Sequence, residues 1–228
     1  MILDEFRIDG QVVVVTGGTK GIGSAVALAL AEAGADVAIV SRSPNQAIEE
    51  SIVSLGRRYL HHSADLTHRE ETKRVISAVV KEMGSVDILV NSSGICPRTP
   101  AKDFSSSDWD ATLEINLTAS FLLAQDAGNI MLTKGKGKII NIASVLSFQG
   151  GINIPAYSTS KHGVAGITKA LANEWAREGV NVNAIAPGYI ATEFIGPLMQ
   201  DPERSKAILD RTPAGRWGNP DDIAGAAV

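Results

Sequence analysis

Short runs of β-branched and other apolar residues alternate along this chain with longer segments whose apolar residues recur at helical spacing. Six runs are read as strands, at residues 11–15, 36–40, 58–62, 86–90, 138–142 and 180–186. The helical pattern covers residues 21–33, 45–55, 68–83, 109–132 and 156–177. Apart from the shorter run at 58–62, the strands are predicted to be buried on both faces, as in parallel sheets. This alternation predicts an α/β fold of three layers, a doubly wound parallel sheet of Rossmann type.

The length of the chain, 228 residues with 44% hydrophobic composition, is enough for one substantial core. We therefore expect a single domain over residues 1–228. Residues 187–220 are rich in glycine and proline around a helical segment at 202–210, which favours a cover over an active site. Residues 221–228 begin a helix and end among apolar residues, so we expect that a final helix and strand are missing from 1–228.

Charge and cysteine content argue against several classes of protein. The 21 basic and 25 acidic residues leave a net charge of −4, which disfavours a nucleic-acid partner. The first ten residues mix charged and apolar side chains, unlike a signal peptide or a membrane span. Cys96 is the single cysteine and is predicted to be a loop or packing residue, with no second thiol for a disulfide or a metal cluster. We expect a cytoplasmic protein without a membrane, metal or nucleic-acid partner.

A glycine-rich turn joins the first predicted strand to the first predicted helix. Such a turn presents backbone N–H groups to a pyrophosphate at a helix N-terminus. Gly17 allows the tight turn, Gly21 lets the backbone approach the diphosphate, and Gly23 lets the helix pack closely on the sheet. A plain strand-to-helix turn is the alternative, which the flanking strand and helix disfavour. The predicted nucleotide contacts of this turn are Thr16, Gly17, Thr19, Lys20, Gly21, Ile22 and Gly23.

The end of the second predicted strand decides which nicotinamide nucleotide is bound. NAD sites place an acid there for the ribose hydroxyls, whereas NADP sites favour a basic residue for the 2′-phosphate. Ser41 and Arg42 stand at this position, and Lys20 lies on the same side. We therefore predict NADP as the preferred cofactor, with NAD as the alternative. A solvated Arg42 that contacts no ligand is the competing interpretation.

Two more segments follow predicted strands and should line the same edge of the sheet. Asp65 and Leu66 follow the third strand and are predicted to contact the adenine. Asn91, Ser92 and Gly94 follow the fourth strand, at the carboxyl edge where ligands bind in such sheets. These five residues complete the nucleotide contacts that the strand pattern predicts.

A serine, a tyrosine and a lysine are placed to carry proton chemistry. Ser144 ends the fifth predicted strand, and Tyr157 and Lys161 lie four apart on one face of the next helix. A free tyrosine titrates near pH ~10, so a neighbouring ammonium group would favour the ionised form that a base needs. Ser144 and Tyr157 would bind the substrate oxygen, and Lys161 would also donate to the nicotinamide ribose. The alternative is an ordinary helical face, because tyrosine and lysine often occur at this spacing.

Taken together, these motifs resemble the short-chain dehydrogenase/reductase family over essentially the whole chain. The resemblance rests on residues 16–23, Ser144, Tyr157 and Lys161. It implies that Asn116 completes a catalytic tetrad by holding a water that relays protons from Lys161. It also implies a segment that fixes the nicotinamide carboxamide, made of Pro187, Gly188, Ile190 and Thr192. Ser92 and Ser93 depart from the family's usual Asn-Ala at this point.

A narrower resemblance, at residues 1–3, 139–151 and 213–218, is to the family's sugar-acid dehydrogenases. These act on 2-deoxy-D-gluconate or 2-dehydro-3-deoxy-D-gluconate, which implies hydride transfer between NAD(P) and a secondary alcohol or ketone of a sugar acid. Arg98 is then a candidate carboxylate anchor and Gln149 a candidate hydroxyl contact. A solvated Arg98 is the alternative. Members of this subgroup are associated mainly with NAD, whereas Ser41, Arg42 and Lys20 favour NADP.

Two other functions remain open. A 3-oxoacyl-carrier-protein reductase would share the tetrad, but its acidic carrier would favour a basic patch, and the helices at 119–133 and 156–177 carry few basic residues. A catalytically silent nucleotide-binding regulator would be expected to have lost a tetrad position, and each position is filled. Small residues along 156–177, together with the family resemblance, predict a homotetramer built on that helix and the preceding one, although internal packing explains them equally well.

Overall fold

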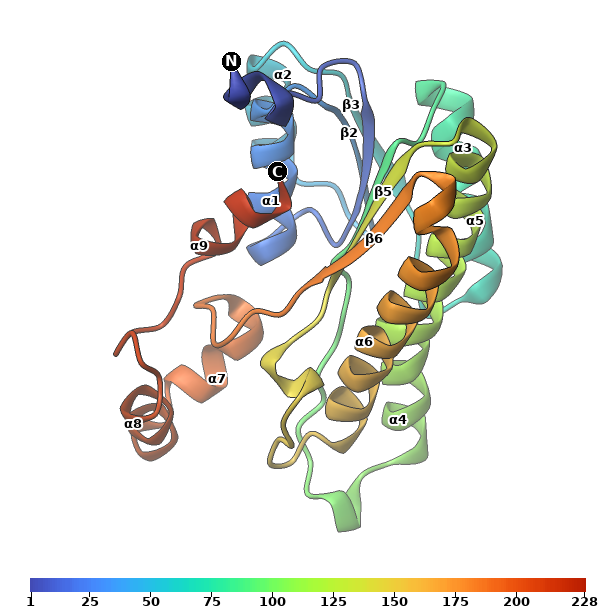
Figure 1. Ribbon diagram of the computed structural model, residues 1–228. Helices are drawn as coiled ribbons and strands as arrows, with labels where there is room; N and C mark the ends of the chain where they lie inside the picture. The colour runs from blue at the N-terminus through green and yellow to red at the C-terminus, as the bar shows by residue number, and fades with distance from the viewer.

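The computed structural model describes residues 1–228 apart from the side chain of Leu3. It contains one six-stranded parallel sheet in the order β3-β2-β1-β4-β5-β6 (Figure 1). The strands are β1 (Val12–Thr16), β2 (Asp36–Ser41), β3 (Tyr59–Ser63), β4 (Ile88–Asn91), β5 (Gly137–Ile142) and β6 (Val180–Ile185). The order reverses beside β1, as in a doubly wound sheet, and the predicted three-layer α/β fold is confirmed.

Helices cover both faces of this sheet. One face carries α1 (Gly21–Glu32) and α2 (Gln46–Ser54), and the other carries α3 (Arg69–Met83), α5 (Ala119–Lys134) and α6 (Pro155–Trp175). Successive strand residues point to opposite faces, so Val13 and Val15 pack with Leu30 of α1 whereas Val12 and Val14 pack on the other side. The central strands are therefore buried on both faces, as their composition predicts.

The helix expected over residues 109–132 is divided. The structure has α4 (Ser106–Leu113), a π-helical turn (η3, Glu114–Thr118) and then α5. Ser105 caps α4 by accepting from the Asp108 N–H at 3.0 Å, which places the start of the helix three residues earlier than expected. The π turn widens the backbone at Asn116, and such turns are often found at functional sites.

Strand β6 differs from the expectation of burial on both faces. Val180 and Val182 are buried, but Asn181, Asn183 and Ala184 are exposed. The strand is the last in the sheet order and packs against α6 through one face, so its first four residues alternate between core and solvent. The prediction of burial on both faces is therefore wrong for β6.

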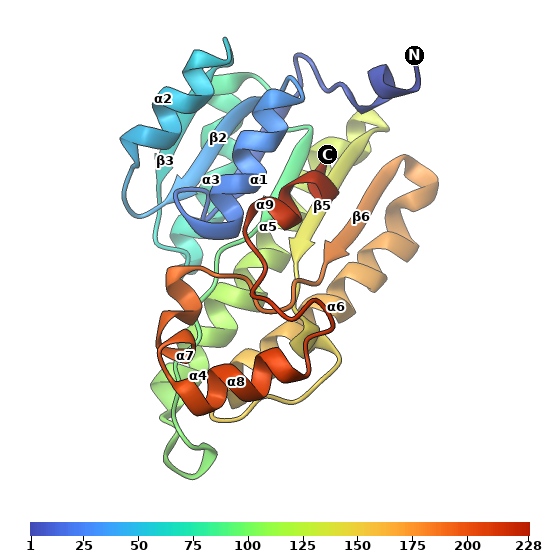
Figure 2. The ribbon, with the colours of Figure 1, turned by 90° about the vertical axis from the view of Figure 1, so that its left-hand side faces the viewer.

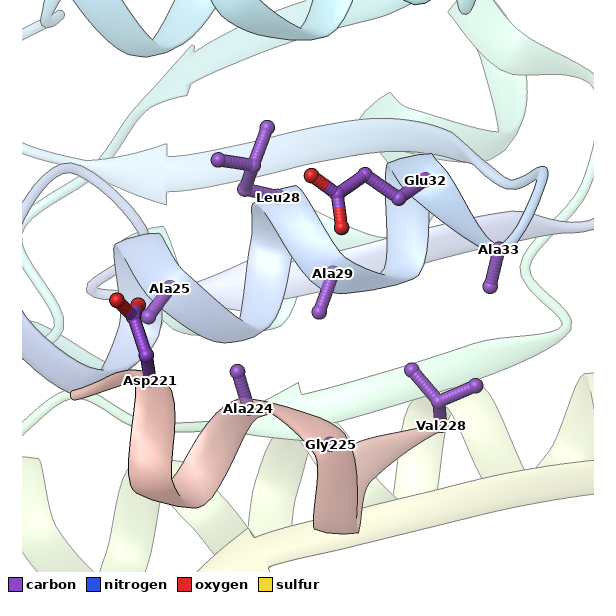
Figure 3. Close-up of a pocket in the computed structure, with 9 residues that line it drawn as sticks. All are labelled: Ala25, Leu28, Ala29, Glu32, Ala33, Asp221, Ala224, Gly225 and Val228. Atoms are coloured by element: carbon purple, nitrogen blue, oxygen red, sulfur yellow. The ribbon is translucent and has the colours of Figure 1, made fainter.

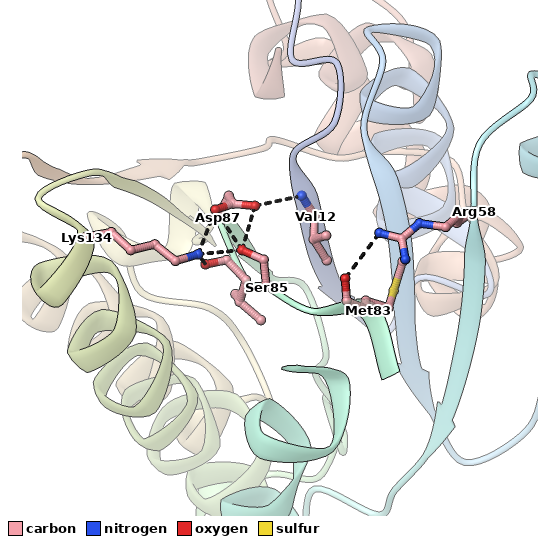
Figure 4. A network of polar contacts seen from close by, with 7 residues as sticks. Val12, Arg58, Met83, Ser85, Asp87 and Lys134 are labelled. Carbon is pink, nitrogen blue, oxygen red and sulfur yellow. Dashed lines mark hydrogen bonds and ion pairs between the residues drawn. The ribbon is translucent and has the colours of Figure 1, made fainter. Parts of the chain in front are cut away.

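A polar cluster secures the amino-terminal ends of β1 and β4 (Figure 4). Asp87 accepts from the Val12 N–H at 2.9 Å and from Lys134 Nζ at 2.9 Å, and Ser85 donates to the same carboxylate. Burial alone would raise the pKa of Asp87, but these donors hold it below its ordinary value. The cluster lies at the edge opposite the carboxyl ends of the strands, where it joins β1, β4 and α5.

The last forty residues lie beyond the carboxyl ends of the strands and then return to α1 (Figure 2). They form η6 (Glu193–Ile195), α7 (Gly196–Met199), α8 (Pro202–Asp210) and α9 (Asp221–Ala224). Ile195, Leu198 and Ile208 make a small core of their own. Residues 221–228 lie along α1, where Ala224 faces Ala25 and Ala29 (Figure 3). We call residues 187–220 the cover.

Candidate active site

Ser144, Tyr157 and Lys161 come together at the carboxyl end of β5. Ser144 follows that strand, and the other two lie in the first turns of α6. Lys161 is 6% exposed, and its Nζ lies 5.6 Å from the centre of the Tyr157 ring and donates to the Ile142 carbonyl at 2.6 Å. Ser144 is close enough to the Tyr157 hydroxyl to lower the pKa of that group. The structure thus brings together the three side chains that the strand and helix spacing predict.

Burial dominates the electrostatics of this cluster. It raises the pKa of Tyr157 to about 12, with the nearby Ser144 hydroxyl acting in the opposite direction. Burial also lowers the pKa of Lys161 to about 8. The sequence led us to expect a Tyr157 pKa lowered by Lys161, and this is wrong, because burial raises the pKa of the phenol and Lys161 is not among the groups that lower it. Ser144 and Arg98 are the groups that stabilise the ionised phenol here.

Ser147 connects the backbone of Ser144 to the backbone of Lys161. It was not predicted as a site residue from the sequence. Its hydroxyl donates to the Lys161 carbonyl at 2.7 Å and accepts from the Ser144 N–H at 3.3 Å. Ser147 is buried, and its position three residues after Ser144 is the spacing of a capping box. That spacing is a signal that the sequence offers, and Ser147 holds the turn after β5 against α6.

Asn116 ties the loop after β4 to α6. Its side chain accepts from the Ile95 N–H at 2.8 Å and donates to the Ile95 carbonyl at 3.0 Å. It also donates to Ser160, whose hydroxyl donates to the Tyr157 carbonyl at 2.7 Å. The amide of Asn116 is therefore occupied by loop and helix groups, and its predicted water-holding role stays a prediction.

The glycine turn has the geometry that a diphosphate needs. Gly17 and Gly21 have φ of +65° and +58°, the left-handed region that favours glycine. A Cβ on Gly23 would lie 2.4 Å from the Gly17 carbonyl oxygen, so only glycine lets α1 start here. No side chain caps the start of α1, and its first turn carries no acid. The open N–H groups of this helix end fit the anionic diphosphate of a dinucleotide.

Thr16 and Asn91 support the wall beside the turn. Thr16 is 1% exposed, and its hydroxyl accepts from the N–H groups of Ser92 and Ser93 at 3.0 and 3.1 Å. Asn91 donates to Asn141 Oδ1 at 2.9 Å. The Thr16 hydroxyl therefore acts on a nucleotide by positioning residues 92–94. Asn91 is held through its side-chain nitrogen, while its buried Oδ1 has no hydrogen-bond partner within the described part of the chain.

The predicted nucleotide contacts at the ends of β2 and β3 are more exposed. Ser41 is half-buried and Arg42 is exposed. Asp65 Oδ1 accepts hydrogen bonds from the N–H and the hydroxyl of Thr67. These two hydrogen bonds are the main reason that the pKa of Asp65 lies below its ordinary value. Leu66 is buried. Lys20 does not lie with Ser41 and Arg42 as expected, because its Nζ pairs with Glu193 of the cover at 2.8 Å.

The first residues of the cover cross this edge of the sheet. Pro187 accepts from the Val145 N–H at 3.0 Å, which fastens the end of β6 to the turn after Ser144. Gly188 follows, and Ile190 is buried. Thr192 Cγ2 would lie 3.3 Å from a Cβ on Gly21. The segment expected to fix the nicotinamide therefore runs from the catalytic cluster to the glycine turn.

The substrate side of Tyr157 contains residues from three loops. Phe194 of the cover packs against the Tyr157 ring, with ring centres 5.7 Å apart. Arg98 is close enough to lower the pKa of Tyr157, and Cys96 lies in the same environment, where burial raises its pKa to about 11. Gln149 is exposed on the loop after Ser147. Phe194 and Cys96 were missed as site residues, since nothing in their local sequence indicates contact with residue 157.

Over the described residues, no cluster of three or more histidine, cysteine or acidic side chains could hold a metal ion. No helix in the same part of the chain is long and apolar enough to cross a membrane.

Comparison with known proteins identifies the family. Residues 11–203 match the family described as short chain dehydrogenase. The chain belongs to this family. It is 47% identical to the 2-dehydro-3-deoxy-D-gluconate 5-dehydrogenase of Escherichia coli (strain K12), over the whole chain and 90% of that protein. It is 41% identical to the D-threitol dehydrogenase of Mycolicibacterium smegmatis, over 98% of the chain and 86% of that protein.

A solved member of the family has the same architecture. The gluconate 5-dehydrogenase of Burkholderia cenocepacia J2315, in complex with NADP and tartrate, superposes with a TM-score of 0.90 at 38% identity. The match covers the whole of this chain and 90% of the other.

Proposed function

We propose that this protein is a sugar-acid dehydrogenase that oxidises a secondary alcohol of a 2-deoxy-D-gluconate or 2-dehydro-3-deoxy-D-gluconate type substrate and reduces the ketone in the reverse direction. NADP is the preferred cofactor and NAD an alternative. The observation that carries the proposal is the Ser144, Tyr157 and Lys161 cluster beside an open glycine turn at one edge of the sheet. The names of the family relatives support the substrate class.

The residues of the cluster divide the proton chemistry. In oxidation Tyr157 takes the hydroxyl proton while Ser144 donates to the same substrate oxygen, and in reduction Tyr157 returns the proton. Ser144 Oγ accepts from the Leu146 N–H at 3.1 Å, which leaves its own proton for that oxygen. A bound nicotinamide nucleotide would supply the hydride chemistry at the carbinol or carbonyl carbon of the substrate. Lys161 donates to the ribose, and Asn116 holds the relay water.

The nucleotide would lie along the edge from Arg42 to Thr192. The N–H groups of the glycine turn, from Gly17 to Gly23, face the diphosphate, and Ser41 and Arg42 face the 2′-phosphate. Thr16 acts through residues 92–94, and the remaining contacts are Thr19, Ile22, Asp65, Leu66, Asn91, Ser92, Gly94, Pro187, Gly188 and Ile190. Lys20 supports the cover through Glu193 in this arrangement.

A carboxylate anchor distinguishes a sugar acid from a neutral polyol. Arg98 lies within electrostatic reach of the Tyr157 hydroxyl, so a carboxylate paired with its guanidinium would place the rest of the substrate beside that hydroxyl. Gln149 is then placed to contact a hydroxyl at the mouth of the site. The Burkholderia enzyme was solved with tartrate, a small hydroxy acid, which is consistent with this class of substrate.

The assembly and the compartment follow the family. Small residues on the outer part of α6, including the exposed Gly166 and Ala170, favour close packing of a partner helix in a homotetramer. We place the protein in the cytoplasm. Light scattering of the purified protein tests the assembly.

A steady-state panel tests the substrate and the cofactor together. The purified protein is assayed with 2-dehydro-3-deoxy-D-gluconate, 2-deoxy-D-gluconate, D-gluconate, D-threitol and a 3-oxoacyl thioester, each with the NADP and the NAD couple. We expect the highest kcat/KM with a sugar acid and the NADP couple. A preference for the oxoacyl thioester would identify the 3-oxoacyl-carrier-protein reductase instead. Absence of turnover together with tight nucleotide binding would favour the regulatory protein.

A further inference from the structure

The carboxyl end of β3 carries three polar residues in succession, His61, His62 and Ser63. The strand pairs with β2 in parallel, with His61 beside Ile39 and His62 beside Val40. Side chains alternate across a strand, so His61 shares a face with Ser41, and His62 points to the opposite face. Strand β3 therefore brings one histidine to the residue where the predicted 2′-phosphate site begins.

The hydroxyl of Ser41 has two hydrogen-bond partners. Its oxygen lies 2.8 Å from the Ser43 carbonyl and 3.0 Å from His61 Nε2. A carbonyl oxygen can only accept, so the single hydroxyl proton goes to Ser43. Both contacts are hydrogen bonds at the same time only when His61 Nε2 carries a proton and donates it. His61 thus holds the Ser41 oxygen as an acceptor and leaves its proton able to turn.

The loop after Ser41 is held from two more directions. Ser63 donates to the Arg42 carbonyl at 3.2 Å, so β3 also holds the backbone of Arg42. Asn45 Nδ2 donates to the Thr19 carbonyl at 2.8 Å, which connects the loop to the glycine turn. Within the part of the chain that the structure describes, the Arg42 guanidinium makes no hydrogen bond or ion pair. The backbone is positioned while the charged group is left for a ligand.

We infer that His61 is a positioning residue for nucleotide choice, which favours the 2′-phosphate of NADP through its hydrogen bond to Ser41. The inference rests on the proposed NADP dependence. With a phosphate beside Ser41, the hydroxyl proton turns from the Ser43 carbonyl to a phosphate oxygen while His61 continues to donate. A hydroxyl that accepts one hydrogen bond donates more strongly, and the gain is larger toward an anion than toward a neutral ribose hydroxyl. His61 therefore affects NADP more than NAD.

Nucleotide binding tests this without any substrate. The Kd values of NADPH and NADH are measured by fluorescence titration of the whole protein. His61→Leu should weaken NADPH by about fivefold, the size of one net hydrogen bond, and change NADH by less than about twofold. His61→Gln keeps a side-chain N–H donor at similar reach and should recover most of the NADPH affinity. His62→Leu is the matched control, because that side chain faces away from Ser41, and it should leave both Kd values unchanged.

A double-mutant cycle separates the hydrogen bond from a general effect on folding. In a Ser41→Ala background, His61→Leu should change NADPH binding no further, because the hydroxyl it positions is gone. Equal weakening of both nucleotides, no weakening of NADPH, or an undiminished effect in the Ser41→Ala background would each overturn the inference. A wild type that binds neither nucleotide would overturn the proposed function and the inference together. A wild type that prefers NADPH but turns over no sugar acid would contradict the substrate assignment and leave this test decisive.

Discussion

The catalytic cluster and the phosphate-facing contacts lie along one edge of the sheet, but in opposite surroundings. Ser144 and Lys161 are buried and hydrogen-bonded to neighbouring segments. Arg42 and Lys20 are exposed. Lys20 forms an ion pair with Glu193, and the two side chains are 72% and 81% exposed. Burial strengthens electrostatic interactions and shifts pKa values, whereas solvent screens exposed charges.

The difference assigns a separate task to each region. The buried cluster should control turnover, with large effects that are the same for both nucleotides. The exposed contacts should control which nucleotide is bound, with smaller effects that depend on salt. Substitutions in each region can therefore support this division or contradict it.

The largest effect is expected from Tyr157→Phe. Removing the hydroxyl takes away the group that exchanges the proton, so kcat should fall by about a thousandfold with either nucleotide. Nucleotide affinity should stay nearly intact, because the ring remains in place against Phe194. Steady-state assays of oxidation and of reduction measure the fall in kcat. Tyr59→Phe, at a tyrosine of β3, is the control. Substantial remaining turnover would remove Tyr157 from the proposed mechanism.

A second prediction concerns the effect of the buried Lys161 on the stability of the protein. Folding lowers the pKa of Lys161 from 10.5 to about 8, so the folded state disfavours its charge. The lowered pKa reduces the free energy of unfolding by about 3 kcal/mol below pH 8. The reduction disappears above pH 10.5, where Lys161 is neutral in both the folded and the unfolded state. Lys161→Met removes the cost but loses the hydrogen bond to Ile142, worth about 1 kcal/mol. We expect an inactive variant that is about 2 kcal/mol more stable at pH 7.

Urea unfolding at pH 7 and at pH 10 measures this gain. Because the wild type recovers its stability between pH 8 and 10.5, the advantage of the variant should shrink at the higher pH. Lys169→Met, an exposed lysine of the same helix, should show no such pattern. An Lys161→Met variant that is less stable at pH 7 would mean that the ammonium is better solvated than its burial indicates.

Local periodicity explains which of these features were predictable. Tyr157 and Lys161 share a helix face, and Ser144 ends a strand, so the regular spacing of helix and strand places them together. The pairing of Lys20 with Glu193 joins residues 173 positions apart, which no local pattern encodes. The tyrosine pKa was mispredicted for a related reason, since burial comes from the whole fold and outweighs a neighbour four residues away.

Arg98→Ala is expected to have the next largest effect, and it acts on the substrate side of the site rather than on the nucleotide. Loss of a carboxylate partner should raise the KM for a sugar acid by about thirtyfold, the effect of a charged hydrogen bond, and should leave nucleotide affinity unchanged. Arg98→Lys keeps the charge without the bidentate geometry, so its KM for a sugar acid should lie between those of the wild type and the alanine variant. A KM that does not change in the alanine variant would exclude Arg98 from the substrate site.

Arg42→Ala should separate the two nucleotides. An exposed guanidinium beside a phosphate is partly screened, so we expect NADPH to bind about tenfold more weakly and NADH to bind almost as before. Fluorescence titration at low and high salt measures both, and the NADPH effect should decrease with salt. Equal losses for the two nucleotides would show that Arg42 holds the loop rather than the 2′-phosphate.

The smallest effect is expected from the pair that joins the glycine turn to the cover. Lys20→Gln and Glu193→Gln should each change nucleotide affinity by about twofold at low salt, because the exposed ion pair is screened by solvent. If Lys20 acts through Glu193, the two variants weaken NADPH and NADH alike, and the double variant is no worse than either single one. If Lys20 leaves Glu193 for the 2′-phosphate, Lys20→Gln weakens NADPH alone while Glu193→Gln strengthens it. The sign of the Glu193→Gln effect therefore decides whether Lys20 belongs with Arg42 or with the cover.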